Sequence, residues 1–306
     1  MQSDVQSHVC VTAARYRLFA IVSFLLIAAS LGACGGDGEA PPVEGAAAEP
    51  SPEPATPPAR APALTEPAAA RTVVSDTLPY AEVDEELVYG HFVFPSDMIE
   101  PLPAVIVIHE WWGLDDTVRE AADRLAAQGY IVLALDLFAG RTTADVRDAR
   151  SLMLEVVEDQ DSVAENVQQA LGFVVDTAGA PGVAVLGWGL GGSWALNTAI
   201  LATDDLDAAV LYYGQVSDEP ERLEPIRAPV LGFFGGDDRG VMADDVRAFE
   251  TAMETLGKRA EITIYPGAGH GFANPANRNY DAELASETWA LTLEFLAAEL
   301  PASAGS

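Results

Sequence analysis

The sequence predicts an α/β fold with a mostly parallel central sheet and helices on both of its faces. Three observations lead to this prediction. Short continuous apolar runs recur along the chain, stretches with helical character separate them, and loops rich in glycine follow several of the runs. A strand that is apolar throughout is typical of a sheet covered on both faces, and alternating strands and helices favour parallel pairing.

The composition sets the size and the charge of the protein. The chain has 306 residues, of which 49% are hydrophobic, enough for one large domain with appendages. Its formal net charge is −31, and after Ser75 there are 12 basic and 40 acidic residues. Such a field repels nucleic acid and anionic surfaces, so no nucleic-acid partner is expected. Solubility explains the charge, and adaptation to high salt is an alternative interpretation.

The first 34 residues have the pattern of an export signal. Arg15 and Arg17 precede an apolar run at 18–31 that is too short for a comfortable membrane span. The run ends in Leu-Gly-Ala-Cys, which resembles the lipobox of bacterial lipoproteins, where the signal is cut before a cysteine that becomes lipidated. We expect a signal peptide at 1–33 and an extracytoplasmic protein anchored to a membrane through Cys34. An ordinary signal peptide with an incidental cysteine is the alternative.

The next segment is too polar and too poor in aromatic residues to bury a core. Residues 34–75 are rich in Ala, Pro and Glu and predict a disordered tether. The folded domain is expected at 76–300, with a short tail at 301–306. The tether would serve as a spacer between a membrane and the domain, although a passive remnant would look the same.

The first half of the domain contains three predicted strands. Residues 87–94 alternate loosely before Pro95, which predicts an edge strand, and 104–108 and 130–135 predict strands buried on both faces. Asp115 or Asp116 is expected to cap a helix that extends to Gln128 and stops at Gly129.

The second half continues the alternation. Helices are expected at 144–157 and 162–175, and a strand follows at 183–186. The remaining elements are strands at 208–213, 229–234 and 261–265, and helices after residue 193, at 243–256 and at 281–300. In such sheets, ligands bind at the carboxyl ends of the strands, and the unusual loops of this chain follow those ends.

The turn at 187–192, Gly-Trp-Gly-Leu-Gly-Gly, has the pattern of a nucleophile elbow between a strand and a helix. Its glycines let the strand and the helix approach closely, but the apex is Gly189, which has no side chain to attack a substrate. A structural glycine turn is the plain alternative. A dinucleotide phosphate loop is also conceivable, although the spacing and the position past the middle of the chain fit it poorly.

Two later loops add a carboxylate and a histidine. Asp238 follows the strand at 229–234, with Asp237 as the second choice, and His270 follows the strand at 261–265. Elbow, acid and histidine come in the chain order of hydrolase triads, in which histidine transfers a proton and the acid orients it. A lone loop aspartate or histidine usually has no such role, but their joint order indicates a catalytic site.

The cysteines and histidines limit the other chemistry. Cys10 and Cys34 both precede the folded part, which excludes a cysteine nucleophile or a cysteine metal ligand there. The four histidines show no metal-ligand spacing. No metal, nucleotide or organic cofactor is expected, and the oligomeric state is left open.

The chain from about residue 81 to residue 296 resembles the dienelactone hydrolase family. The matching segments are 107–114 (Val-Ile-His-Glu-Trp-Trp-Gly-Leu), 136–138 (Asp-Leu-Phe), the turn at 187–192, Gly235 with Asp238, and 265–272 around His270. The resemblance implies an α/β-hydrolase fold and hydrolysis of lactones or small esters through an acyl-enzyme. It also implies that Asp238 and His270 complete the triad.

The resemblance extends to the rest of the site. Glu110 fits the acid that contacts the resting nucleophile, and the backbone N–H groups of Leu190 and Trp111 would form the oxyanion hole. Aromatic side chains are expected to line a pocket for a flat or apolar small molecule, while Trp194 is expected in the core. The pocket residues are Trp111, Trp112, Trp188 and Phe272.

The departure from the family pattern is Gly189, where the family carries cysteine or sometimes serine. Ser193 lies one helical turn further on, where its hydroxyl is expected to face the packed helix. Two functions follow: a slow hydrolase of small esters or lactones that uses water, or a pseudo-hydrolase that binds a small ester, lactone or carboxylate. A purely structural surface lipoprotein would leave the Asp238 and His270 loops unexplained.

Overall fold

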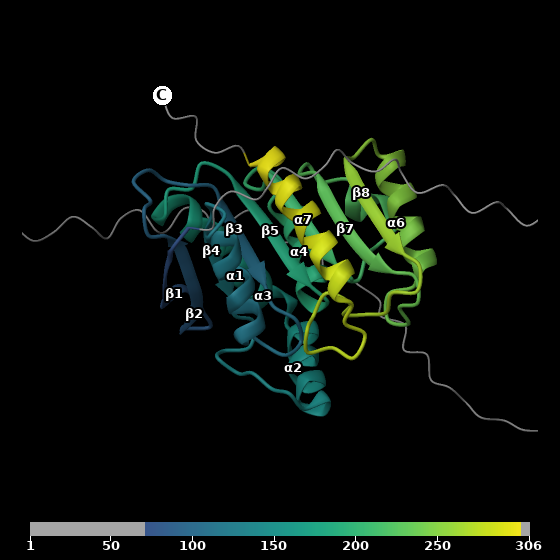
Figure 1. Ribbon diagram of the computed structural model, residues 1–306, viewed down its shortest axis with the longest axis horizontal. Helices are drawn as coiled ribbons and strands as arrows, with labels where there is room; N and C mark the ends of the chain where they lie inside the picture. Colours follow the sequence, from purple (N-terminus) through teal and green to yellow (C-terminus); the bar gives the residue numbers. More distant parts are fainter. Residues whose placement is uncertain (1–70, 301–306) are drawn as a thin grey trace, which may run out of the picture. The chain divides into compact units, whose positions relative to one another are not determined.

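The computed structural model describes residues 71–300, which form one eight-stranded sheet covered by helices (Figure 1). The predicted signal peptide, Cys34, the tether up to residue 70 and the tail at 301–306 lie outside the described residues. The strands are β1 (Val73–Val83), β2 (Glu86–Pro95), β3 (Ala104–Ile108), β4 (Ile131–Leu135), β5 (Val183–Trp188), β6 (Ala208–Tyr212), β7 (Val230–Gly235) and β8 (Ala260–Tyr265).

The sheet is mostly parallel, and the predicted fold class is confirmed. The strand order is β1-β2-β4-β3-β5-β6-β7-β8. All neighbours from β4 to β8 pair in parallel, and β2 pairs antiparallel with both β1 and β4. Every residue of β3, β4, β5, β6 and β7 is buried, which explains their continuous apolar sequences.

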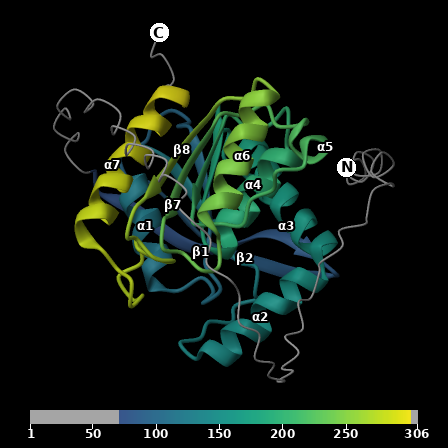
Figure 2. The same ribbon diagram turned by 90° about the vertical axis from the view of Figure 1, so that its right-hand side faces the viewer.

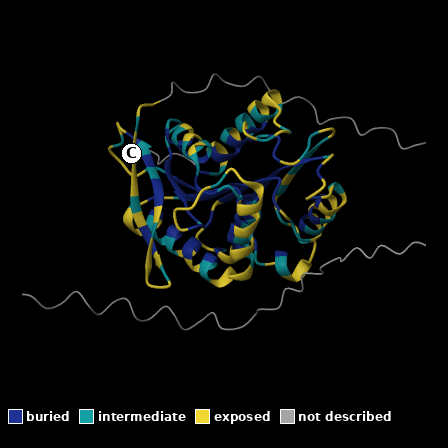
Figure 3. Cartoon of the chain, turned by 90° about the horizontal axis from the view of Figure 1, so that it is seen from below, coloured by how far each residue is buried: buried dark blue, intermediate teal, exposed yellow. Residues whose placement is uncertain are grey.

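The helices form one layer on each face of the sheet. Helices α1 (Asp116–Ala126) and α7 (Ala282–Glu299) lie on one face, as Figures 1 and 2 show. The other face carries α2 (Val146–Glu158), α3 (Gln160–Gly172), α4 (Leu190–Leu201) and α6 (Ala243–Thr255). Two apolar cores result, and Figure 3 shows the buried sheet between helices whose outer sides are exposed.

The amino-terminal hairpin corrects one prediction. β2 was expected at the edge, but β1, which begins at Val73, lies outside it. Most of β1 is exposed and it contains Pro79, so it lacks the apolar alternation that identifies a strand. Asp84 and Glu85 connect the hairpin with φ values of 52° and 65°, without the Asn-Gly pair that usually marks such a turn.

The helix boundaries differ from the predictions by a few residues. The side chain of Asp115, not Asp116, caps α1 by accepting a hydrogen bond from the Val118 N–H at 3.1 Å. The helix expected at 162–175 begins at Gln160 and becomes a π-helical turn at Phe173–Thr177, and a short helix α5 (Pro220–Leu223) was not predicted. Between residues 71 and 300, no helix combines the length and apolarity needed to cross a membrane.

Candidate active site

Strand β5 turns sharply into α4 at Gly189, which has φ 53° and ψ −112°. The Gly189 N–H donates to the Tyr212 carbonyl at 2.9 Å, and this bond ties the turn to the neighbouring strand β6. A Cβ on Gly191 would collide with the carbonyl of Ile108, so glycine is required where α4 crosses β3. The elbow geometry is therefore present, although its apex has no side chain.

Asp238 and His270 meet at the carboxyl ends of β7 and β8. The distance from His270 Nδ1 to Asp238 Oδ2 is 2.8 Å, while Asp238 Oδ1 accepts hydrogen bonds from the N–H groups of Gly240 and Val241. Nδ1 therefore carries the proton, and Nε2 is the nitrogen left to accept one. A Cβ on Gly189 would lie 3.6 Å from that Nε2. Asp238 rather than Asp237 makes this contact.

The pair shifts the pKa values of both of its members. Burial raises the pKa of Asp238, but the hydrogen bond and charge of His270 outweigh burial and lower it below its ordinary value. Burial lowers the pKa of His270, but the hydrogen bond and charge of Asp238, with a contribution from Glu110, raise it above its ordinary value. The charged pair is thus favoured. The His270 side chain is 45% exposed, so a small molecule can reach it.

Glu110 lies on the other side of Gly189, in the loop that follows β3. Its Cγ is 3.8 Å from the position of a Cβ on Gly189. Its carboxylate accepts a hydrogen bond from the Tyr213 hydroxyl at 2.9 Å and another from the Asn274 amide at 2.7 Å. Burial raises the pKa of Glu110, and these two hydrogen bonds offset part of the increase.

Tyr213 and Asn274 are site residues that the sequence did not single out. Tyr213 follows β6 with an unusual φ of 41° and packs edge-on to the ring of His270 at 5.1 Å. Asn274 lies four residues after His270 in the same loop. Their one available signal was their place along the chain: Tyr213 is the last residue of a predicted strand, and Asn274 lies in the loop that carries His270.

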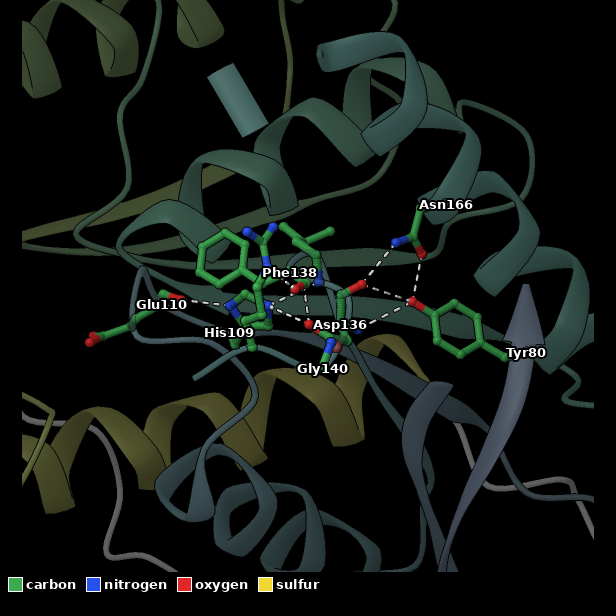
Figure 4. A network of polar contacts seen from close by, with 9 residues as sticks. Tyr80, His109, Glu110, Asp136, Phe138, Gly140 and Asn166 are labelled. Carbon is green, nitrogen blue, oxygen red and sulfur yellow. Dashed lines mark hydrogen bonds and ion pairs between the residues drawn. The ribbon is translucent and has the colours of Figure 1, made fainter. Parts of the chain in front are cut away.

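A buried network supports the loop that carries Glu110 (Figure 4). His109 is fully buried, and its Nε2 accepts a hydrogen bond from the Leu137 N–H at 3.0 Å. Its Nδ1 must then carry the proton, which it donates to the Glu110 carbonyl at 2.6 Å. This ring therefore ties the loop after β3 to the loop after β4.

The same network extends to β1 and α3. The hydroxyl of Tyr80 donates to Asn166 Oδ1 at 2.6 Å and accepts from the Asp136 N–H at 3.2 Å. The Asn166 amide donates to the Asp136 carbonyl at 2.9 Å, and Figure 4 shows these side chains converging on Asp136. The segment 136–138 thus holds the backbone at His109 and Glu110 in place.

Two backbone N–H groups follow the ends of adjacent strands at the elbow. Leu190 begins α4 and Trp111 follows Glu110, and they come after the adjacent strands β5 and β3. Within residues 71–300, neither N–H donates a hydrogen bond to another protein group. The Leu190 N–H also lies at the positive end of the helix dipole, where it favours an anionic oxygen.

Ser193 is committed to structural hydrogen bonds. Its hydroxyl donates to the Gly189 carbonyl at 3.2 Å and accepts from the Gln215 N–H at 2.8 Å. These bonds hold the first turn of α4 to the loop after β6. Ser193 therefore does not supply the nucleophile that Gly189 lacks.

Only some of the aromatic residues expected in the pocket line the same cavity. Trp112 and Trp188 line a cavity of about 240 Å³ that also borders Glu110, and Trp111 packs edge-on to Trp112 outside its lining. Phe272 does not line this cavity. It is fully buried against the ring of Tyr213 at 5.3 Å, because its backbone turns it under the site into the core. Trp194 is in the core, as expected.

The part of the chain at 71–300 contains no group of three or more His, Cys, Asp or Glu side chains with the geometry to hold a metal ion. The described site itself offers a histidine paired with an aspartate, groups of the kind that can transfer a proton.

Comparison with known proteins places these features in context. The model of the dienelactone hydrolase family matches residues 89–300. A protein of Aquifex aeolicus named "Putative carboxymethylenebutenolidase" is 29% identical over 200 residues, covering 63% of this chain and 87% of the relative. Protein usf of Aquifex pyrophilus is 30% identical with the same coverage.

Solved structures share the fold. A dienelactone hydrolase-like promiscuous phosphotriesterase from metagenomic libraries superposes with a TM-score of 0.68 at 23% identity, covering 74% of this chain and 98% of its own. A crystal structure of a "Putative Dienelactone Hydrolase" from Klebsiella pneumoniae gives a TM-score of 0.67 at 24% identity, covering 74% of this chain and 99% of its own. At these identities the likeness concerns the fold.

Proposed function

Because this chain belongs to the dienelactone hydrolase family, we propose that it hydrolyses small carboxylic esters or lactones with water in place of a side-chain nucleophile. The observation that carries the proposal is the geometry around Gly189. A Cβ there would meet His270 Nε2 at 3.6 Å and the Glu110 Cγ at 3.8 Å, both ordinary contact distances. His270, which Asp238 holds by a hydrogen bond, and Glu110 thus lie on either side of the position of the missing side chain, and this supports the proposal.

In the proposed reaction, a water molecule beside Gly189 transfers a proton to His270 Nε2 as its oxygen attacks the substrate carbonyl carbon. The N–H groups of Leu190 and Trp111 stabilise the oxyanion that forms. When the tetrahedral intermediate collapses, His270 returns the proton to the leaving oxygen, and the products are an acid and an alcohol. Asp238 holds the tautomer and stabilises the imidazolium. No acyl-enzyme forms.

The expected rate is low. Removing the nucleophile from a hydrolase triad costs on the order of 10⁶ in rate, which leaves about 10³–10⁴ over the reaction in water. The proposal therefore concerns a slow general-base hydrolase.

The test is hydrolysis of a small activated ester and an enol lactone by the full chain, with His270→Ala measured in parallel. We expect activity in the parent protein that disappears in the variant, without a burst of released alcohol, because no covalent intermediate accumulates. A burst would contradict the water mechanism. Equal rates in the two proteins would refute hydrolysis by this site.

A second candidate function is supported by the commitment of Ser193 to structural bonds and the absence of a side chain at Gly189. In this alternative the protein is a pseudo-hydrolase that binds a small ester, lactone or carboxylate beside His270 and does not convert it. Equal rates in the previous experiment, combined with a carboxylate-dependent change in the His270 NMR signals, would favour this function.

We also propose that the protein is exported and held at a membrane by a lipid on Cys34. The support is the sequence itself: the two arginines, the apolar run and the Leu-Gly-Ala-Cys ending at residue 34. The Cys34→Ala variant is expected to leave the membrane fraction of expressing cells. Continued membrane association of that variant would refute a lipid anchor at Cys34.

A further inference from the structure

Residues of α1 and α7 line a cavity of about 240 Å³. Both helices cover the same face of the sheet (Figure 1). The cavity is somewhat smaller than the sites of drug-sized ligands, which are about 300–1,000 Å³. Glu110 borders it, whereas Gly189, Asp238 and His270 do not. Its lining is rich in aromatic rings: Trp112, Trp188, Tyr212, Tyr280 and Trp289.

The charged groups of the cavity are mainly acidic. Glu110, Asp115 and Glu120 are among the residues that line it, and Arg124 is the one arginine among them. Glu110 is buried and holds two hydrogen-bond donors, Tyr213 and Asn274, on its carboxylate oxygens. A ligand that enters therefore meets an excess of negative charge, in a protein whose net charge is also strongly negative.

One wall of the cavity already holds a cation. The guanidinium carbon of Arg124 lies 4.2 Å from the ring centroid of Trp289, a cation–π contact. Within residues 71–300, Arg124 forms no ion pair with a carboxylate. The face of Trp289 thus already contacts a cationic group.

We propose that the cavity between α1 and α7 binds a small organic cation, with its ammonium group against the aromatic rings and beside the carboxyl groups. An alkylated ammonium suits this lining because its methyl groups contact the ring faces while its charge is balanced by Glu110, Asp115 and Glu120. An anion would be repelled by three carboxyl groups, and an uncharged ligand would gain nothing from them. The site does not depend on hydrolysis beside Gly189.

The direct test is calorimetric titration of the full chain with choline at moderate salt. The matched controls are 3,3-dimethylbutan-1-ol, which has the same shape without the charge, and 3,3-dimethylbutanoate, which carries the opposite charge. We expect choline to bind at least about tenfold more tightly than the neutral analogue. Equal binding of the two, preference for the anion, or no binding of choline would each overturn the proposal.

Variants locate the binding in this cavity. Trp289→Ala should weaken choline binding, and Trp289→Phe should retain part of it because a ring is kept. Arg124→Gln should tighten choline binding several-fold, since it removes the cation that competes for the face of Trp289. An anion site would respond to Arg124→Gln in the opposite direction.

The control for overall charge is Arg150→Gln, which removes an exposed arginine from α2, outside the cavity lining. It should leave choline affinity nearly unchanged. An equal gain in the Arg124 and Arg150 variants would mean that bulk charge, and not the cavity, controls binding, and would overturn the proposal. The far-UV circular dichroism of each variant establishes that it folds.

Discussion

Gly189 keeps the backbone geometry of a nucleophile elbow without the nucleophile. Its φ of 53° and ψ of −112° suit glycine and strain residues that have a Cβ. Space is not the obstacle, because an added Cβ would make only ordinary contacts with His270 and Glu110. The residue therefore combines a relaxed backbone with a position beside His270, and both properties can be tested by substitution.

We expect Gly189→Cys to raise esterase activity by orders of magnitude, because the new thiol would lie beside His270 Nε2 and close to two backbone donors. Gly189→Ala is the matched control, since it adds the same Cβ without a nucleophile. The measurement is kcat/KM for an activated ester, together with detection of an acyl-enzyme by mass spectrometry. Equal activity of the two variants would mean that the surrounding groups are not arranged for catalysis.

The same alanine variant tests the backbone strain. Gly189→Ala should lower the free energy of unfolding by about 1–3 kcal/mol, the cost of holding a residue with a side chain in such a conformation. Denaturant unfolding monitored by tryptophan fluorescence measures it. An alanine variant as stable as the parent would show that the elbow of this protein is unstrained.

The pH dependence follows from the raised pKa of His270. A general base must be neutral, so the rate should rise with pH, with a midpoint above the ordinary histidine value of about 6.5. Asp238→Asn should move this midpoint to lower pH and reduce the maximal rate, because it removes the charge that favours the imidazolium. An unchanged midpoint in that variant would show that another group controls the profile.

The contribution of His270 to the stability of the protein falls with rising pH, whereas the proposed rate rises. Because the folded-state pKa of His270 is raised, its contribution to stability is complete below the unfolded pKa and is lost as the pH rises through the folded pKa. The pKa of Asp238 is lowered, so its contribution is lost as the pH falls through its folded pKa. The charged pair therefore stabilises the protein between the folded-state pKa of Asp238 and that of His270. At higher pH His270 is neutral, which is the form that a general base needs, and this stabilisation is lost.

Among the elements, the contact of α4 with β3 and β5 places the site. The amino terminus of α4 lies directly over these strands because glycines occupy its first turn. This close approach brings the first turn of α4 against the end of β3, which the loop with Glu110 and Trp111 follows. The buried ring of His109 links that loop to the segment after β4, through hydrogen bonds with the Glu110 carbonyl and the Leu137 N–H.

Gly191→Ala is expected to destabilise the protein by about 1–3 kcal/mol or more, because its Cβ would overlap the Ile108 carbonyl and push α4 away from the sheet. Gly172→Ala is the control. It lies at the end of α3 in open surroundings and should gain about 0.5–1 kcal/mol from helix propensity. Thermal unfolding of both variants gives the comparison. Equal effects would argue against a close contact at Gly191.

At the scale of the whole molecule, charge is the dominant property. The 40 acidic residues after Ser75 face 12 basic ones, and several of the arginines form exposed ion pairs, such as Arg141 with Glu155 and Arg259 with Glu299. Exposed pairs of this kind contribute little to stability. The remaining acidic groups repel one another, which penalises the folded state.

The melting temperature should therefore rise with added salt. Raising NaCl from 0.1 M to 1 M shortens the screening length from about 10 Å to about 3 Å and weakens the repulsion. Differential scanning calorimetry of the full chain measures the effect, with sucrose at matched osmolality as the control. A melting temperature that stays constant or falls would show that repulsion between the acidic groups does not destabilise the folded protein.

The fold class, the order of the elements and the loops with Glu110, Asp238 and His270 followed from the amino-acid sequence. Each depends on local information: continuous apolar runs, helix caps and glycine turns, read together with a family resemblance. The exposed strand β1 escaped notice because neither its side-chain pattern nor its turn is distinctive.

Tertiary packing alone decided the contacts between distant segments. It surrounded Glu110 with Tyr213 and Asn274 and turned Phe272 into the core. It also formed the aromatic cavity between α1 and α7. These outcomes depend on the direction of each side chain after strands far apart in the chain are brought side by side, and no local pattern specifies that direction.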